Sequence, residues 1–139
     1  MKYSACRFID ANIIMYAIGA PHPLKNPCRA ILDEIKNGSL QVVTNTEVLQ
    51  EILYRFYSLK RNDQAEIAYN ALVGMCLDIL PVTRKDMDNA LSLLKEFPHI
   101  TTRDAVHAAT MINNEIEEII STDSHFDLIQ GIKRAKPEK

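Results

Sequence analysis

The sequence predicts an α/β fold with three layers, α/β/α, around a mostly parallel sheet of four to five strands. Short apolar runs alternate along the chain with longer stretches in which apolar residues recur at helical spacing. The short runs are apolar almost throughout, as is typical of strands that helices cover on both faces. The 139 residues are 47% hydrophobic and 24% charged, which suits one globular domain and excludes wholesale disorder.

Four short runs are the expected strands. The first stops at Asp10-Ala11-Asn12, a polar sequence that suits a turn directly after a buried strand. The second contains Val42, Val43 and Thr44, and such β-branched residues favour extended backbone. The expected ranges are 6–9, 40–44, 77–82 and 118–121.

Helical stripes separate these runs, and two in a row between the second and third strands are the one expected irregularity. The stripes span residues 28–35, 48–56, 68–75, 87–94 and 105–112. Asn37-Gly38 is a helix stop for the first of them. Side chains suited to capping helix N-termini precede the others. They are Thr46, Asp63 with Glu66, Thr83, and Thr101 or Thr102.

We expect one domain over residues 1–132, followed by a basic, frayed tail over residues 133–139. No apolar run is long enough to span a membrane, and the first residues do not resemble a signal peptide. The 3 cysteines are odd in number and widely spaced, which argues against a disulfide framework. These observations predict a cytoplasmic protein with no membrane partner.

Several kinds of site are excluded by spacing. The 4 glycines are isolated from one another, so neither GxGxxG nor a P-loop can be written. The 4 histidines lack zinc-finger or HExxH spacing, and no GxSxG elbow supports Ser-His-Asp hydrolysis. The net charge of −2 offers no large basic field, so any contact with nucleic acid must be local or carried by metal ions.

Four acidic residues are expected to converge at one edge of the sheet. Asp10 closes the first strand and Asp123 the fourth, and the carboxyl ends of parallel strands share the edge where ligands bind. Glu51 borders the buried stripe of its helix, and Asp104 is in register with the packed residues of a later helix. Asp127 follows close behind. Taken singly, such acids are more often turn formers, helix caps or first-turn acids.

Taken together, the four acids predict a metal site. Two carboxylates about 4 Å apart repel by about 4 kcal/mol at an effective dielectric constant of about 20, and a divalent cation removes this conflict. Mg²⁺ or Mn²⁺ takes oxygen ligands and supports attack on a phosphodiester. Glu47 lies farther from the apolar stripe and is the weaker candidate. His107 lies about 140° from the centre of its helix's stripe, so we expect an exposed histidine without a catalytic role.

The residues around the four acids form four segments. They are Phe8-Ile9-Asp10-Ala11-Asn12-Ile13, Val48-Leu49-Gln50-Glu51-Ile52-Leu53, Arg103-Asp104-Ala105-Val106-His107-Ala108-Ala109 and Ser121-Thr122-Asp123-Ser124-His125-Phe126-Asp127. In order and spacing the segments resemble the motifs of PIN-domain nucleases. The likeness spans nearly the whole chain and is strongest to single-domain prokaryotic proteins that include VapC-type toxins. Ala11 stands where that family often has threonine.

The resemblance implies a divalent-metal-dependent endoribonuclease that hydrolyses RNA as the toxin of a toxin–antitoxin pair. It makes the acidic quartet the Mg²⁺ or Mn²⁺ ligands and the catalytic residues, with Glu51 either ligating the ion or orienting the attacking water. The quartet is Asp10, Glu51, Asp104 and Asp123, and the auxiliary residues are Asn12, Thr122 and Asp127. One ion or two is left open.

The resemblance also implies a homodimer and a small antitoxin protein that masks the pocket. A cluster of apolar residues on one helix favours both partners, because it exceeds what a single buried stripe requires. The cluster is Tyr54, Phe56, Tyr57 and Leu59.

Two alternatives stay open. One is another acid-pocket phosphohydrolase or a phospho-accepting receiver. A haloacid-dehalogenase-like phosphatase would need Asp-x-Asp after the first strand, where the third residue here is Asn12. The other is a catalytically inactive PIN-fold interaction module, whose expected signature is a missing member of the quartet, and none is missing.

Overall fold

The structure is a computed structural model that describes residues 2–138. Its centre is a five-stranded sheet in the order β3-β2-β1-β4-β5, and every neighbouring pair is parallel. The strands are β1 (Arg7–Ile9), β2 (Val42–Asn45), β3 (Asp78–Leu80), β4 (Glu118–Ile120) and β5 (Lys133–Ala135). The predicted fold, three layers around a parallel sheet, is confirmed.

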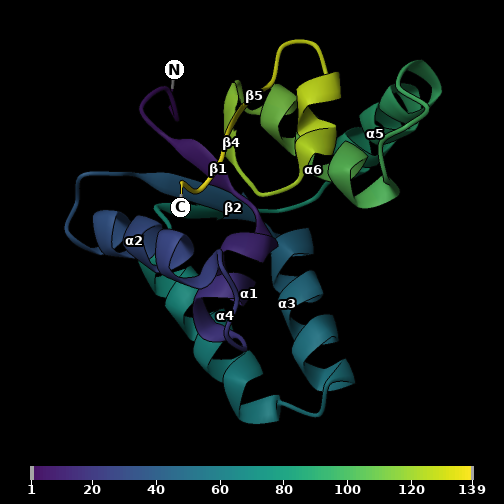
Figure 1. Ribbon diagram of the computed structural model, residues 1–139. Coiled ribbons are helices and arrows are strands. Elements are labelled where there is room, and N and C mark those ends of the chain that lie inside the picture. The colour runs from purple at the N-terminus through teal and green to yellow at the C-terminus, as the bar shows by residue number, and fades with distance from the viewer. Residues whose placement is uncertain (1, 139) are drawn as a thin grey trace.

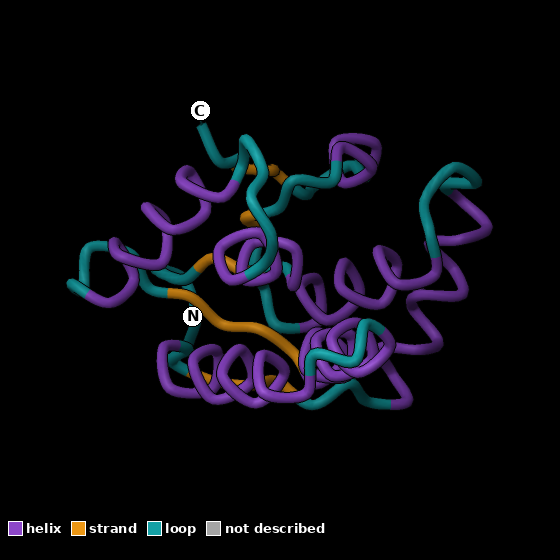
Figure 2. Tube along the Cα trace, turned by 60° about the horizontal axis from the view of Figure 1, so that its bottom comes forward, coloured by secondary structure: helices purple, strands orange, loops and turns teal. Residues whose placement is uncertain are grey.

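Helices fill each connection between the first four strands. They are α1 (Ala11–Ile18), α2 (Lys25–Lys36), α3 (Thr46–Ser58), α4 (Asn62–Met75), α5 (Arg84–Glu96) and α6 (Thr102–Asn113), and the short 3₁₀ helix η1 (Ser124–Leu128) joins β4 to β5. Figure 1 shows α1 to α4 gathered below the strands and α5 and α6 on the other side. Figure 2, turned so that the bottom of Figure 1 comes forward, shows the strands with helices around them. Helix pairs are therefore the rule here, and the prediction that only the second and third strands enclose a pair is wrong. The expected stripes at 87–94 and 105–112 correspond to a second pair, α5 and α6.

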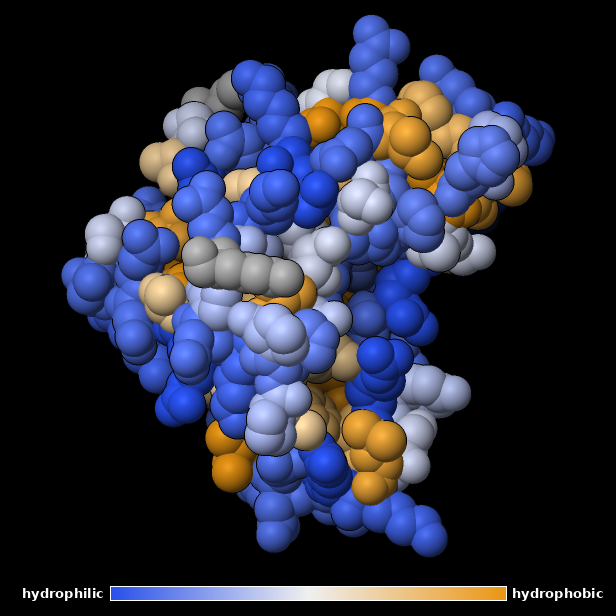
Figure 3. Space-filling view, viewed as in Figure 1, coloured by the Kyte–Doolittle hydropathy of each residue, from blue (hydrophilic) through white to orange (hydrophobic). Residues whose placement is uncertain are grey.

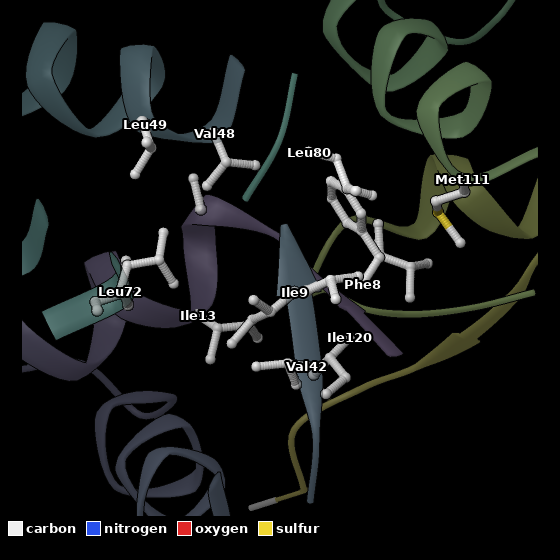
Figure 4. Packing of buried hydrophobic residues seen from close by; sticks show 14 of the residues in the cluster. Phe8, Ile9, Ile13, Val42, Val48, Leu49, Leu72, Leu80, Met111 and Ile120 are labelled. Atoms are coloured by element: carbon white, nitrogen blue, oxygen red, sulfur yellow. The ribbon is translucent and has the colours of Figure 1, made fainter. Parts of the chain in front are cut away.

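The core lies on both faces of β1, the central strand. Phe8 and Ile9 are fully buried and, as successive strand residues, point to opposite faces. Figure 4 shows Ile9 beside Ile13 and Val42, and Phe8 on the side of Met111. Burial on both faces explains why the strands read as continuous apolar runs rather than as alternating ones.

Helix α1 replaces the turn that the sequence predicts at residues 10–12. Asp10 is its N-cap, and the Asp10 Oδ1 atom accepts a hydrogen bond of 2.8 Å from the backbone N–H of Ala11. The same acid therefore ends a strand and begins a helix. The helix escaped prediction because it is short and has almost no polar residues to define a stripe.

Two of the predicted caps are confirmed and two are wrong. Thr83 and Thr101 accept from the backbone N–H three residues on, and Thr83 does so in a complete capping box. Helix α3 is capped by Asn45 rather than by Thr46, because Asn45 accepts from the backbone N–H of Val48. Helix α4 begins one residue before Asp63 and has no side-chain cap.

The C-terminal segment is not frayed where it was expected to be. Strand β5 pairs with β4, and the backbone N–H of Ser121 donates to the carbonyl of Ala135 at 3.1 Å. Arg134 also donates to the Ser121 carbonyl at 3.1 Å. The basic residues read as a solvated tail therefore complete the sheet.

The apolar cluster of α3 divides between core and surface. Phe56 is buried, whereas Tyr54, Tyr57 and Leu59 are 60%, 56% and 59% exposed. The prediction that all four form surplus surface is wrong for Phe56. Among the helices described, none combines the length and the apolar composition that crossing a bilayer requires.

Candidate metal centre

The four predicted acids stand at the carboxyl edge of the sheet or on the helices beside it. Asp10 follows β1, and Asp123 lies three residues after β4, where it caps η1. Glu51 lies in α3, and Asp104 is in the first turn of α6. Because β1 and β4 are parallel neighbours, their ends lie level, and the Asp10 N–H donates to the Ile120 carbonyl at 3.0 Å.

Two clusters of possible ligands form there. One oxygen each from Asp10 and Glu51 and one ring nitrogen of His107 lie within 4.8 Å of one another. The same holds for Asp104, Asp123 and His125. Each cluster therefore has two carboxylates and one imidazole at distances that a single cation could bridge.

Electrostatics joins the two clusters. Burial raises the pKa of Asp104 to about 6, and the negative charges of Asp123 and Asp10 act in the same direction. Burial also raises the pKa of Asp10, against the opposing influence of His107 and the Ser121 hydroxyl. Carboxyls that are costly to ionise alone become favourable anions beside a cation.

Several atoms of the clusters have no hydrogen-bond partner although they are buried. Within residues 2–138 there are five such side-chain atoms, and four belong to these clusters. The four are Glu51 Oε1, Asp104 Oδ2, His107 Nε2 and His125 Nδ1. Buried oxygens without donors are costly, and they are the ligands that a hard divalent cation takes. The residues present therefore fit a divalent metal.

Asn12 belongs to the network that holds Asp10. Its Nδ2 donates to Asp10 Oδ2 at 3.2 Å, and its Oδ1 accepts from the backbone N–H of Thr122 at 3.2 Å. Sequence reasoning missed Ser121, whose hydroxyl donates to Asp10 Oδ2 at 2.7 Å and accepts from the Asp123 N–H at 3.0 Å. The Ser121 hydroxyl thereby links the first acid to the loop of the fourth.

Asp127 does not join the clusters. Its two carboxylate oxygens accept from Nε and a terminal nitrogen of Arg134, each at 3.0 Å. These bonds lower the pKa of Asp127, which is exposed. Asp127 therefore pairs with Arg134 of β5, a strand whose sequence reads as a tail, and its auxiliary role stays a prediction.

His107 is fully buried, and the prediction of an exposed histidine is wrong. Its Nε2 lies 3.8 Å from Asp10 Oδ1 and 3.7 Å from Glu51 Oε1. Helix α6 is buried on nearly every side from Asp104 to Met111, so an angle measured from one apolar stripe carries no information. The small residues Ala105, Ala108 and Ala109 were the available signal, since they permit close packing all round.

Basic side chains line the cleft that leads to the acids. The cleft has a volume of about 640 Å³, and Figure 3 shows the surface hollowed between α3 and the helices above it. It is lined by Asn12, Glu51, Thr122 and Asp123, by the three arginines Arg55, Arg61 and Arg103, and by apolar residues of α1 and α3. Arg103 also donates to Glu51 at 3.3 Å. Arginines beside a candidate cation site are suited to holding phosphate groups.

Comparisons with known proteins agree with one another. The PIN domain family model matches residues 7–132. Ribonuclease VapC13 of Mycobacterium tuberculosis is 37% identical over 126 residues, covering 91% of this chain and 96% of that protein. Ribonuclease VapC23 of the same species is 32% identical over 84% of this chain and 91% of its own length.

Solved structures show the same fold. VapBC2 from Rickettsia felis, bound to a DNA fragment from their promoter, matches with a TM-score of 0.71 at 17% identity, over 94% of this chain and 98% of that chain. VapC20 of Mycobacterium tuberculosis, a toxin that cleaves the sarcin-ricin loop, matches with a TM-score of 0.70 at 16% identity, over 84% and 89%.

Proposed function

The chain belongs to the PIN domain family, and on that premise we propose that it is a divalent-metal-dependent endoribonuclease, the toxin of a toxin–antitoxin pair. Relatives that are 37% and 32% identical over most of the chain are named ribonucleases, which supports an RNA substrate. The observation that carries the proposal is the pair of acidic clusters, with buried oxygens that lack donors, at the end of a cleft lined by arginines.

The four acids are proposed as the metal ligands. Asp10, Asp104 and Asp123 would hold Mg²⁺ or Mn²⁺, because they offer only oxygen atoms and two of them have a raised pKa that a cation would lower. When bound, such an ion makes water more acidic and offsets the charge that develops on a phosphodiester. Glu51 would ligate the ion or orient the attacking water, since its Oε1 is free of hydrogen-bond donors.

Other residues of the chain would position the substrate and the ligands. Arg55, Arg61 and Arg103 line the cleft and would hold the RNA backbone through its phosphates. The Ser121 hydroxyl and the Asn12 amide hold the Asp10 carboxylate in one orientation. Held in this way, the carboxylate loses little freedom when it binds a cation.

A homodimer and a small antitoxin are proposed as protein partners. Tyr54, Tyr57 and Leu59 remain exposed on and just after α3, an apolar surface larger than a lone side chain would leave. The cleft that an antitoxin would mask lies beside this surface, since Leu59 lines it as well. Light scattering tests the homodimer. Toxicity on expression, together with a small protein that co-purifies, tests the antitoxin. A monomer at high concentration, without toxicity or a co-purifying small protein, would remove both.

The nuclease is tested with purified protein and mixed RNAs in the presence of Mn²⁺, Mg²⁺ or chelator, beside an Asp10→Asn control. Asn keeps the shape of the side chain and removes the charge that would hold the cation. We expect internal cleavage that needs the metal and is lost in the variant. Activity that survives both chelation and the substitution contradicts the proposal. If the protein hydrolyses a small phosphomonoester and leaves the RNA uncleaved, the result favours the acid-pocket phosphohydrolase instead.

A further inference from the structure

His107 is the buried side chain whose part in the site the proposed mechanism leaves open. Its ring lies in α6 against Phe8 of the central strand, with ring centroids 5.3 Å apart. Its Nε2 faces two acids, Asp10 at 3.8 Å and Glu51 at 3.7 Å, and has no hydrogen-bond partner. From these distances alone, His107 could be either a metal ligand or a hydrogen-bond donor to the two carboxylates.

The other ring nitrogen decides between these roles. His107 Nδ1 lies 3.2 Å from the side-chain nitrogen of Asn45, the residue that caps α3. The orientation of the Asn45 amide is fixed independently, because its Oδ1 faces the backbone N–H of Val48 at 3.0 Å and a backbone N–H can only donate. The nitrogen end of the amide must therefore face His107.

The orientation of the Asn45 amide fixes which nitrogen of the imidazole accepts a hydrogen bond. The Asn45 Nδ2 atom carries two hydrogens, and one is donated to Thr110 Oγ1 at 3.0 Å. Thr110 can accept it, because its own hydroxyl donates to the Val106 carbonyl at 3.0 Å. The second hydrogen points at His107 Nδ1, which must accept it with a lone pair. A neutral ring that accepts at Nδ1 carries its proton on Nε2.

We infer that His107 is a positioning residue: a neutral imidazole, locked by Asn45 with its proton on Nε2, that donates toward Asp10 and Glu51 and does not bind the metal. This inference rests on the proposed function for its consequence, although the proton position is a property of the metal-free protein. The Nε2–H faces two carboxylates from different elements, one after β1 at 3.8 Å and one in α3 at 3.7 Å, and its partial positive charge attracts both. It leaves their remaining lone pairs for the cation.

The locked proton also bears on which metal the site selects. An imidazole ligand would favour zinc, copper or nickel, whereas a ligand set of carboxylate oxygens favours magnesium or manganese. With Nε2 occupied by a proton, the cluster of Asp10, Glu51 and His107 offers only oxygen to an ion. Asn45 would thus act on metal choice from a position that touches no acid of the cluster.

The proton position is tested by long-range ¹H–¹⁵N correlation NMR of the metal-free protein, with His107 assigned by its absence in His107→Gln. We expect a protonated Nε2 and an unprotonated Nδ1, and the same pattern after saturation with Mg²⁺. A proton on Nδ1, or loss of the Nε2 proton when Mg²⁺ binds, overturns the inference. Neither result depends on cleavage, so the failure of the inference is distinguishable from that of the nuclease.

The positioning role is tested by Mg²⁺ and Mn²⁺ calorimetry on paired variants. Asn45→Ser keeps a capping oxygen for α3 but is too short to reach the ring. Asn113→Ser is the matched control, because the Asn113 amide also donates to a buried side chain, that of Asp86 at 2.6 Å, which lies outside both clusters. We expect about a tenfold loss of Mn²⁺ affinity in Asn45→Ser, mixed tautomers in its NMR spectrum, and unchanged affinity in Asn113→Ser.

Substitution of the ring itself separates donation from packing. His107→Leu fills the space without a donor, and His107→Gln restores an N–H near the position of Nε2. We expect about a tenfold loss of Mn²⁺ affinity in the first and recovery of most of it in the second. Equal affinities in wild type, His107→Leu and Asn45→Ser would overturn the role. If His107→Leu fails to fold, the tautomer and the Asn45→Ser titration still decide.

Discussion

Helices α5 and α6 begin with the same four-residue pattern, but the aspartate of that pattern has a different role in each. Thr83 caps α5 with Asp86 three residues on, and Thr101 caps α6 with Asp104 three residues on. Both aspartates are buried, at 2% and 5% exposure. In each case the backbone N–H of the aspartate donates to the threonine hydroxyl, at 3.2 Å and 3.1 Å. The two begin from one local structure.

The surroundings of the carboxylates separate them. Asp86 Oδ2 accepts from the Thr83 N–H at 3.1 Å, and Oδ1 accepts from Asn113 at 2.6 Å, so both oxygens are satisfied by α5 and α6. Asp104 Oδ2 has no donor and faces His125 at 3.4 Å, in a cluster with Asp123. A buried acid whose bonds are complete stabilises the fold, and one left incomplete beside other acids is available to a ligand.

The largest difference between the two acids is expected in activity. Asp104→Asn should lower metal-dependent RNA cleavage by more than about 100-fold, since even residues behind the metal ligands are worth 10–100-fold. Asp86→Asn should leave the rate per folded molecule within about twofold. Single-turnover cleavage of one defined RNA measures both. Equal losses in the two variants would mean that Asp104 is only a first-turn acid of α6.

The response to metal should divide the variants next. Added Mn²⁺ at about 100 times its dissociation constant stabilises a protein that binds it only when folded by about 2.7 kcal/mol. We expect a rise in melting temperature of several degrees for wild type and Asp86→Asn, and a much smaller one for Asp104→Asn and Asp123→Asn. Thermal melts with Mn²⁺ and with chelator give the comparison. A wild type that Mn²⁺ does not shift contradicts the shared site.

Without metal, we expect Asp86→Asn to be the less stable variant and Asp104→Asn the more stable one. Asp86→Asn places an amide nitrogen against a backbone N–H or the Asn113 amide, so we expect a loss of about 1–3 kcal/mol. Asp104→Asn removes a charge from a crowded acidic cluster, so the metal-free protein should melt higher than wild type. Urea unfolding in chelator measures both changes. A lower stability of Asp104→Asn than of wild type would contradict the expected repulsion between the acids.

The smallest expected effect is on the pH dependence of stability. The pKa of Asp104 is raised from 3.8 to about 6 in the folded protein, so between these values the folded state holds a proton that the unfolded chain has released. The metal-free protein should therefore lose stability as pH rises through this window, and Asp104→Asn should lose less. Unfolding at pH 4, 5, 6 and 7 in chelator tests this. Parallel profiles for the two proteins would contradict it.

The two aspartates also show how far sequence reasoning reaches. The strand ends placed Asp10 and Asp123 at one edge because parallel strands share their direction, and the fold followed from alternating patterns. No local pattern distinguishes Asp86 from Asp104, because the difference lies in what α6 and η1 bring beside each. Spacing made Asp104 a candidate beside the packed face of its helix, although taken singly it reads as a favourable first-turn acid, and the resemblance to a family then implied that it is a metal ligand.

Other features depended on partners that a linear pattern does not contain. His107 and Ser121 belong to the site because they lie beside Asp10. They are 97 and 111 positions away from it along the chain. The arginine that pairs with Asp127 lies on β5, a strand with charged residues that reads as a tail. The short helix α1 was hidden because only its cap, Asp10, separates it from β1 and because it has almost no polar residues to define a stripe.

The place of β1 in the middle of the sheet sets the order of events in time. It is the first strand to be synthesised, yet one of its two neighbours, β4, is the fourth. The Asp10 carboxylate therefore cannot contact Ser121 and Asp123 until nearly the whole chain has been synthesised. A nascent chain therefore holds its acids apart, and the two acidic clusters are complete only once the late strand β4 pairs with β1.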